Sequence, residues 1–282
     1  MRRIIKKILI GDYLFLSITW LCGTLAVILP IFMVCFLLKE GIHVLSWDFL
    51  TEEPQGFPLG TAGGIWPAIK GSLFIVCVGI VVSLPLAVSS AVFLSEYCSF
   101  LFINRTVSFI NDCLAGVPSV VYGLCGYALF VVFSGFNVSL ISGGLTLALI
   151  MFPQIFIGTY ASLSDISPLL KEAGMAYGVT KTYVIKKIIF PLTWPRIIGI
   201  ASLSAGHAMG AAAPILFTAA VIHSPGRMSL SSPVMTLPTH LYFLVGEGVS
   251  FDHAYGTALV LVVILIAANI ISGVIKKIAS KY

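Results

Sequence analysis

Residues 14–38 read LFLSITWLCGTLAVILPIFMVCFLL, a run of 25 residues without a charged side chain. A helix needs ~20 apolar residues to cross the ~30 Å hydrocarbon core of a bilayer, so this run is long enough to span a membrane. Five further apolar runs follow, at about 71–94, 107–133, 138–163, 196–222 and 254–274. The sequence therefore predicts an all-α, polytopic membrane protein with about six transmembrane helices.

The composition of the whole chain supports this class. Of the 282 residues, 59% are hydrophobic and only 27 are charged, 16 Lys and Arg against 11 Asp and Glu. A soluble domain carries ~25% charged residues, so these charges are too few to cover the surface of a soluble enzyme. No basic patch interleaved with aromatic residues is present, so we expect membrane lipid around the chain and no nucleic acid. The six cysteines contain no C-x-x-C pair, and no metal site is expected.

The Lys and Arg residues predict the orientation of the helices. If the N-terminus is cytoplasmic, 13 of these 16 residues fall in inside segments, and only Lys39, Lys70 and Arg227 fall outside. Cytoplasmic loops of membrane proteins carry such an excess of Lys and Arg. We therefore expect both termini to be cytoplasmic. Residues 1–62 would form an N-terminal segment, an uncleaved first helix and an external loop, and residues 63–282 the main transmembrane domain.

One predicted cytoplasmic loop, residues 164–195, has a distinctive pattern. It reads Glu172-Ala173-Gly174-Met175-Ala176-Tyr177-Gly178, then nine residues, then Ile188-Ile189-Phe190-Pro191. Gly178 suits the left-handed turn that ends a short helix, and Thr180 can cap a second helix. Pro191 and Pro195 are expected to stop that second helix from running directly into the fifth span. The pattern predicts a compact helix–turn–helix on the cytoplasmic face.

This spacing resembles the E-A-A-x3-G-x9-I-x-L-P signature of ABC importer permeases, with Gly174 in place of the second Ala and Phe190 in place of Leu. The resemblance implies the type I, MetI-like permease fold and a loop that docks into a cleft of an ATPase subunit. Glu172 would contact or orient the ATPase, and Gly178 would allow the turn. The coupling residues implied are Glu172, Ala173, Gly174, Gly178, Ile188 and Pro191.

Other segments resemble the phosphate-specific permeases of PstA type, namely residues 63–72, 91–97, 109–124 and 210–219. This resemblance implies an importer of inorganic phosphate in a bacterial cytoplasmic (inner) membrane. The partners it implies are a PstC-like second permease, two PstB-like ATPase subunits and a PstS-like periplasmic or extracellular binding protein. The chain has no G-x-x-x-x-G-K-[ST] loop, so no catalytic residue or bound cofactor is expected in it. ATP and Mg²⁺ would bind to the partner ATPase.

A second set of residues is predicted to line the translocation path or the interface between the permeases. His207 is the only histidine within a predicted membrane core, and ionisable groups in spans usually face a cavity or a partner. Gly206 and Gly210 share one helix face, which favours close packing against the second permease. Pro118 would bend the third span. The full set is Pro118, Ser119, Gly206, His207, Gly210, Ala211 and Pro214.

The chain departs from the phosphate-permease pattern at positions that are usually charged. Ile157 and His207 stand where Arg is usual, and Ala211 stands where Glu is usual. An anion path through a low-dielectric slab favours fixed positive charge or many hydrogen-bond donors. Three explanations remain open: the second permease supplies the charge, the substrate differs, or this subunit is functionally reduced. A secondary transporter or channel is a further alternative, although we find neither a convincing repeat nor a mid-span carboxylate.

Overall fold

Long apolar helices dominate the structure, a computed structural model that describes residues 2–98, 100–176, 178–222 and 229–279. The α-helices are α1 (Arg2–Gly41), α2 (Trp47–Thr51), α3 (Trp66–Val92), α4 (Leu101–Ala115), α5 (Ser119–Gly126), α6 (Leu140–Ser164), α7 (Pro168–Ala176), α8 (Lys181–Val184), α9 (Phe190–Met209), α10 (Ala212–Thr218), α11 (Leu237–Gly246) and α12 (Phe251–Ala279). Three π-helical segments, η1 (Phe93–Tyr97), η2 (Tyr127–Phe133) and η3 (Ile185–Ile189), join some of them. The strands β1 (Pro54–Gln55) and β2 (Ala62–Gly63) pair antiparallel.

Among the described residues, five helices are long and apolar enough to cross a membrane. They are Phe15–Gly41, Trp66–Tyr97, Leu140–Ser164, Lys181–Met209 and Phe251–Ile275. A sixth span is reached if the bent pair of α4 with α5 and η2 counts as one. The prediction of about six transmembrane helices is therefore confirmed, although two of the predicted spans differ in shape.

The predicted third span, at about 107–133, is broken rather than straight. Its two halves, Leu101–Ala115 and Ser119–Phe133, meet at 100°. Pro118 opens the second half, where its lack of an N–H costs nothing. The Leu114 carbonyl at the break accepts hydrogen bonds from the Tyr122 hydroxyl at 2.8 Å and from the Val117 N–H at 3.1 Å. The composition of an apolar run indicates its length but not its direction, so the sequence alone predicts one straight helix here.

The predicted fifth span, at about 196–222, is displaced toward the N-terminus. The helix runs without interruption from Lys181 to Met209, so the expectation that Pro191 and Pro195 would separate it from the cytoplasmic loop is wrong. The η3 segment ends at Ile189, two residues before Pro191, and its wider turn gives the proline ring room that a regular α-helix lacks. The span ends instead at Gly210, and the chain restarts as α10.

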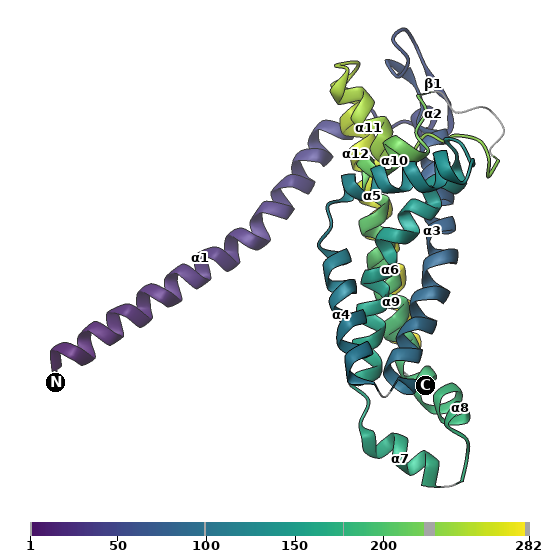
Figure 1. Cartoon of the computed structure of the whole chain (residues 1–282). Helices are drawn as coiled ribbons and strands as arrows, with labels where there is room; N and C mark the ends of the chain where they lie inside the picture. Colours follow the sequence, from purple (N-terminus) through teal and green to yellow (C-terminus); the bar gives the residue numbers. More distant parts are fainter. Residues whose placement is uncertain (1, 99, 177, 223–228, 280–282) are drawn as a thin grey trace.

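Helix α6 lies at the centre of the bundle, between α3 and α9 (Figure 1). Glycines allow α3 and α6 to approach closely: a Cβ on Gly79 would lie 3.2 Å from Met151 Sδ and 3.4 Å from Leu147 Cβ. In the most apolar stretch of α6, 67% of the residues are buried inside the chain, whereas none is buried in the corresponding stretch of α1. Helix α1 leaves the bundle at an angle and contacts α12 near one end (Figure 1).

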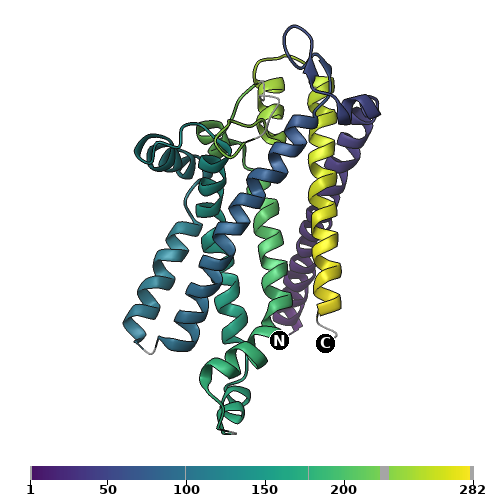
Figure 2. The same cartoon turned by 90° about the vertical axis from the view of Figure 1, so that its right-hand side faces the viewer.

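The two ends of the bundle differ as the charge pattern predicts. The N-terminal end of α1, the C-terminal end of α12 and the α7 segment lie at one end, and α2, the β-hairpin and α11 lie at the other (Figures 1 and 2). The two predicted external loops pack on each other there through a small apolar cluster that includes Phe49, Ile65, Met235 and Leu237. We therefore treat the α7 end as cytoplasmic.

Candidate coupling and translocation sites

Helix α7 projects below the bundle at the cytoplasmic end (Figure 1). Pro168 is its first residue, and the helix exposes two large apolar side chains, Leu169 (76% exposed) and Leu170 (41% exposed). Exposed apolar side chains on a soluble loop are costly unless a partner covers them. This arrangement suits a helix that docks into an apolar cleft of another protein.

The EAA-like residues divide between the two sides of α7. Glu172 and Ala173 are exposed. Gly174 faces the other way, because a Cβ there would lie 3.1 Å from Val184 Cγ2 and 3.3 Å from Ile188 Cδ1. A larger residue at Gly174 would push α7 away from the helix that follows. The turn between α7 and α8 therefore brings Gly174 and Ile188 together, and Glu172 on the other side of α7 is exposed to a partner.

Gly178 makes the turn between α7 and α8 in the predicted conformation. Its φ is +76°, in the left-handed region that other residues adopt at a cost. Thr180 then caps α8, and its hydroxyl accepts a hydrogen bond from the Tyr183 N–H at 3.3 Å. The predicted turn and second helix start are both confirmed. Tyr177 lies outside the described residues.

The beginning of α8 is fastened to the cytoplasmic end of α3, a contact that the sequence did not suggest. The Lys181 ammonium donates to the Glu96 carbonyl and lies 5.3 Å from the centre of the Tyr97 ring. The Tyr97 and Thr182 hydroxyls are 3.4 Å apart. Because these residues are about 85 positions apart, no local pattern could have revealed the contact. A movement of the loop would therefore reach α3 as well as α9.

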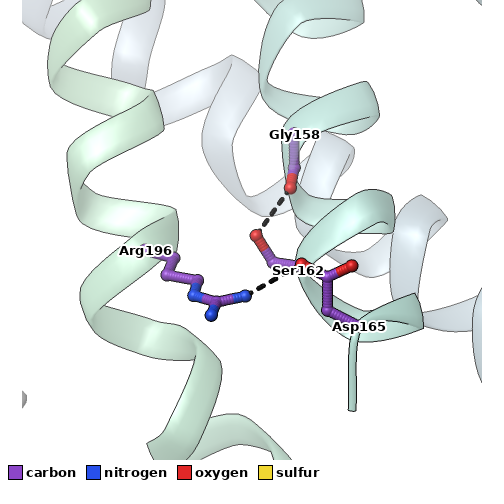
Figure 3. A network of polar contacts seen from close by, with 4 residues as sticks. All are labelled: Gly158, Ser162, Asp165 and Arg196. Carbon is purple, nitrogen blue, oxygen red and sulfur yellow. Dashed lines mark hydrogen bonds and ion pairs between the residues drawn. The ribbon is translucent and has the colours of Figure 1, made fainter.

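A second link joins the loop to the bundle (Figure 3). Arg196 of α9 forms an ion pair with Asp165, which ends α6, at 3.1 Å, and the Ser162 hydroxyl donates to the Gly158 carbonyl at 2.8 Å. Both charged side chains are more than half exposed, so the pair contributes at most ~1 kcal/mol to stability. The pair joins the C-terminal end of α6, which precedes α7, to α9.

The membrane-embedded polar site is a hollow between α6, α9 and α12. It has a volume of about 560 Å³ and is lined by Gln154, Ile200, Leu203, Ser204, Gly206, His207, Leu265 and Asn269. The Gln154 side-chain nitrogen lies 3.3 Å from His207 Nδ1. His207 thus faces a cavity, as the sequence suggested, but Gln154 was missed because a single amide in an apolar run is not a recognisable motif.

The two glycines near His207 have different surroundings. A Cβ on Gly206 would meet Leu265 Cδ2 at 3.6 Å and Asn269 Nδ2 at 4.0 Å, both on α12 of this same chain. Gly210 is exposed and ends α9. Close packing of this helix face against a second permease stays a prediction. Gly210 is more accessible to such a partner than Gly206 is.

The remaining predicted path residues lie on two short helices that pack together. Pro118 and Ser119 begin α5, and Ala211 and Pro214 lie at the start of α10. A Cβ on Gly123 of α5 would lie 2.8 Å from the Pro214 Cα, so the two backbones touch. Both helices follow a break in a membrane span, and the breaks bring backbone polar groups to the same region of the bundle.

Ile157, at a position usually charged in phosphate permeases, packs against the main apolar core and does not line the Gln154–His207 hollow. Within the described ranges, no group of three or more His, Cys, Asp or Glu residues could hold a metal ion. The polar side chains that line the hollow are those of Gln154, Ser204, His207 and Asn269.

The geometry agrees with a comparison against protein families. The family described as binding-protein-dependent transport system inner membrane component matches residues 83–281. The chain belongs to this family. The matched residues include the coupling loop, both short helices and the polar hollow, and they leave α1 and the β-hairpin outside.

Individual relatives cover nearly the whole chain. The probable phosphate transport system permease protein PstA of Methanocaldococcus jannaschii is 30% identical over 92% of this chain and 91% of its own length. The PstA permease of Mycobacterium leprae is 29% identical over 91% and 86%. The probable ABC transporter permease YqgI of Bacillus subtilis is 27% identical over 93% of each chain. The resemblance to PstA-type permeases is thereby confirmed.

Solved structures support the fold. A chain of the MetNI methionine ABC transporter, in an inward-facing conformation, aligns with a TM-score of 0.60 at 19% identity, over 77% of this chain and 94% of its own. A chain of a bacterial alginate ABC transporter aligns with a TM-score of 0.60 at 16% identity, over 95% and 91%. The predicted type I importer permease fold is confirmed.

Proposed function

We propose that this ABC importer permease subunit takes up inorganic phosphate across a bacterial cytoplasmic membrane. It would share the path with a PstC-like permease, receive phosphate from a PstS-like binding protein and dock two PstB-like ATPases. The observation that carries the coupling role is the exposed α7 segment, which ends at a left-handed Gly178 and is followed by α8, whose Lys181 donates to the Glu96 carbonyl of η1. ATP and Mg²⁺ would act on the partner ATPase.

Coupling in this proposal depends on a stiff connection from α7 to the path. Helix α8, η3 and α9 form one continuous span from Lys181 to Met209, and His207 lies near its far end. A push on α7 is passed along this span, because Gly174 packs directly on Val184 and Ile188. The helix does not need to bend for the displacement to reach the polar hollow.

The substrate assignment is supported by the PstA names of several relatives. The chain itself contributes donor and acceptor groups at Gln154, His207 and Asn269 rather than Lys or Arg side chains. In this proposal, the second permease supplies the positive charge that a phosphate ion needs in a low-dielectric path. The two short helices α5 and α10 add backbone donors near the break in each span.

The test is uptake of radiolabelled phosphate into vesicles that contain the assembled complex and the binding protein, with arsenate and sulfate as competitors. Phosphate uptake that requires ATP and is inhibited by arsenate but not by sulfate is expected. If the complex assembles but takes up no phosphate, and none of these anions competes, phosphate is not the substrate. Uptake driven by an ion gradient without the ATPase would overturn the importer mechanism.

A further inference from the structure

A long apolar groove runs down the outside of the bundle, between α3 with η1 on one side and η3 with α9 on the other. It has a volume of about 640 Å³ and lies outside the polar hollow described above. Its lining includes Leu84, Val88 and Phe93 on one wall and Phe190 and Trp194 on the other. Almost the whole wall is apolar, so the groove favours an apolar occupant over water.

The length of the groove along the helix axis matches the thickness of one leaflet of a bilayer. Its wall on α3 and η1 extends from Leu84 to Phe93, ten residues whose nine steps rise about 14 Å along the helix. Half of a ~30 Å hydrocarbon core is about 15 Å. Because α3 runs from the external to the cytoplasmic end, the groove lies at the depth of the inner leaflet (Figure 1).

The mouth of the groove carries the only formal charge in its lining. Lys186 lies there, and Tyr97 lines the same groove. Aromatic side chains of this kind gather at the membrane–water interface, and a lysine at that level attracts anionic headgroups. Among the described residues, Lys186 has no ion-pair partner, whereas Arg196 is paired with Asp165.

The other polar groups at the groove already have hydrogen-bond partners or near neighbours within the chain. The Ser89 hydroxyl already donates to the Pro85 carbonyl at 2.6 Å, and the Tyr97 hydroxyl lies 3.4 Å from that of Thr182. Lys181 is held by the Glu96 carbonyl at the side of the groove. The Lys186 ammonium is therefore the group available to an incoming headgroup.

We propose that this groove binds one anionic phospholipid of the inner leaflet, with an acyl chain between α3 and α9 and the headgroup phosphate at Lys186. The juxtaposition of a leaflet-deep apolar groove and a single unpaired lysine at its mouth carries the assignment. Lys186 also falls within the nine-residue spacer of the coupling motif, so the lipid would contact the segment between α7 and the fifth span. The lipid site is formed by this chain alone and does not depend on phosphate being the transported substrate.

The experiment is native mass spectrometry of the full-length chain and of the assembled complex, with added phosphatidylglycerol or phosphatidylcholine of identical acyl chains. We expect phosphatidylglycerol to bind in preference to phosphatidylcholine. Lys186→Gln should weaken phosphatidylglycerol binding by about fivefold, the effect of one basic side chain near an anionic surface. Lys187→Gln is the matched control, because Lys187 is the adjacent lysine and is also exposed, but it does not line the groove.

A second variant tests the apolar part of the site. Val88→Trp fills the groove from the α3 wall and should reduce binding of both lipids. Equal loss of binding in Lys186→Gln and Lys187→Gln would overturn the proposal, because the headgroup would then respond only to general positive charge. Binding lost on assembly would show that the second permease covers the groove, which would also overturn it. Displacement by inorganic phosphate alone would assign Lys186 to a free anion instead.

Discussion

Replacing Gly178 by Val should uncouple the ATPase while leaving the helices in the membrane. Gly178 has a φ of +76°, and a Cβ added there would meet nothing within 4 Å. The Cβ itself therefore causes no clash, and the expected effect comes from the backbone conformation. That isolates the turn between α7 and α8 as the feature under test.

The magnitude follows from the cost of the left-handed conformation. An L-residue with a Cβ loses about 1–2 kcal/mol in this region, and a β-branched residue lies at the upper end. Since 1.4 kcal/mol is a factor of ten, the population of the native turn should fall by roughly 5- to 30-fold relative to other loop conformations. Coupling should fall by a comparable factor, because α7 would no longer point in one direction.

The assay is co-purification of the ATPase with the permease from membranes, followed by substrate-stimulated ATP hydrolysis in vesicles. Gly248→Val is the matched control: Gly248 has a φ of +65°, also has nothing within 4 Å of an added Cβ, and lies between α11 and α12 at the external end. Both variants carry the same backbone penalty. Normal ATPase docking in Gly178→Val, or an equal defect in Gly248→Val, would refute the assignment of the turn to coupling.

Three further changes test other parts of the structure. Glu172→Lys should prevent ATPase assembly without loss of expression, because the side chain is exposed, whereas Glu52→Lys on the external face should not; pull-down from membranes distinguishes them. His207→Leu should lower uptake several-fold with unchanged expression, since it removes the polar partner at 3.3 Å in the hollow, and unchanged uptake would exclude this hollow from the path. Burial, followed by the charge of His253, lowers the pKa of His240 to about 4. An unfolded histidine has a pKa of ~6.5, so the unfolded state binds more protons below that pH, and stability should fall by about 2 kcal/mol from pH 7 to pH 5. Thermal unfolding at both pH values should show this loss, and His240→Gln should flatten it; an equal loss in the variant would assign the pH effect elsewhere.

The sequence was most informative where one physical property dominates. Length and apolarity alone predicted the spans that became α1, α3, α6 and α12, because any long charge-free run must cross the bilayer as a helix. The distribution of Lys and Arg predicted which ends lie together. Neither property depends on contacts between distant segments.

The breaks in the helices could not be predicted in the same way. Pro118 breaks its span by 100°, whereas Pro191 lies inside a continuous helix. The two prolines differ in what surrounds them: Tyr122 satisfies the carbonyl left free near Pro118, and η3 widens the turn before Pro191. These are tertiary and local backbone solutions, and residue type does not report them.

The candidate site was predicted in part for a related reason. Gly178 and Thr180 act through their own backbone, so their roles were visible in the sequence. Gln154 and Lys181 act through partners that are 53 and 85 residues away. Their importance depends on which helices become neighbours, and that information appears only in the folded chain.

The contact between α1 and α12 has a consequence for the order of synthesis. These are the first and last helices of the described chain, and they meet where Phe36 and Tyr255 pack edge to face at 5.7 Å. Within the described residues, the only extensive contact of α1 is with α12, so α1 gains its main packing partner in this chain only once α12 has been made. During that interval α1 lacks its main partner within the chain, and a truncation that removes α12 would leave α1 without that contact.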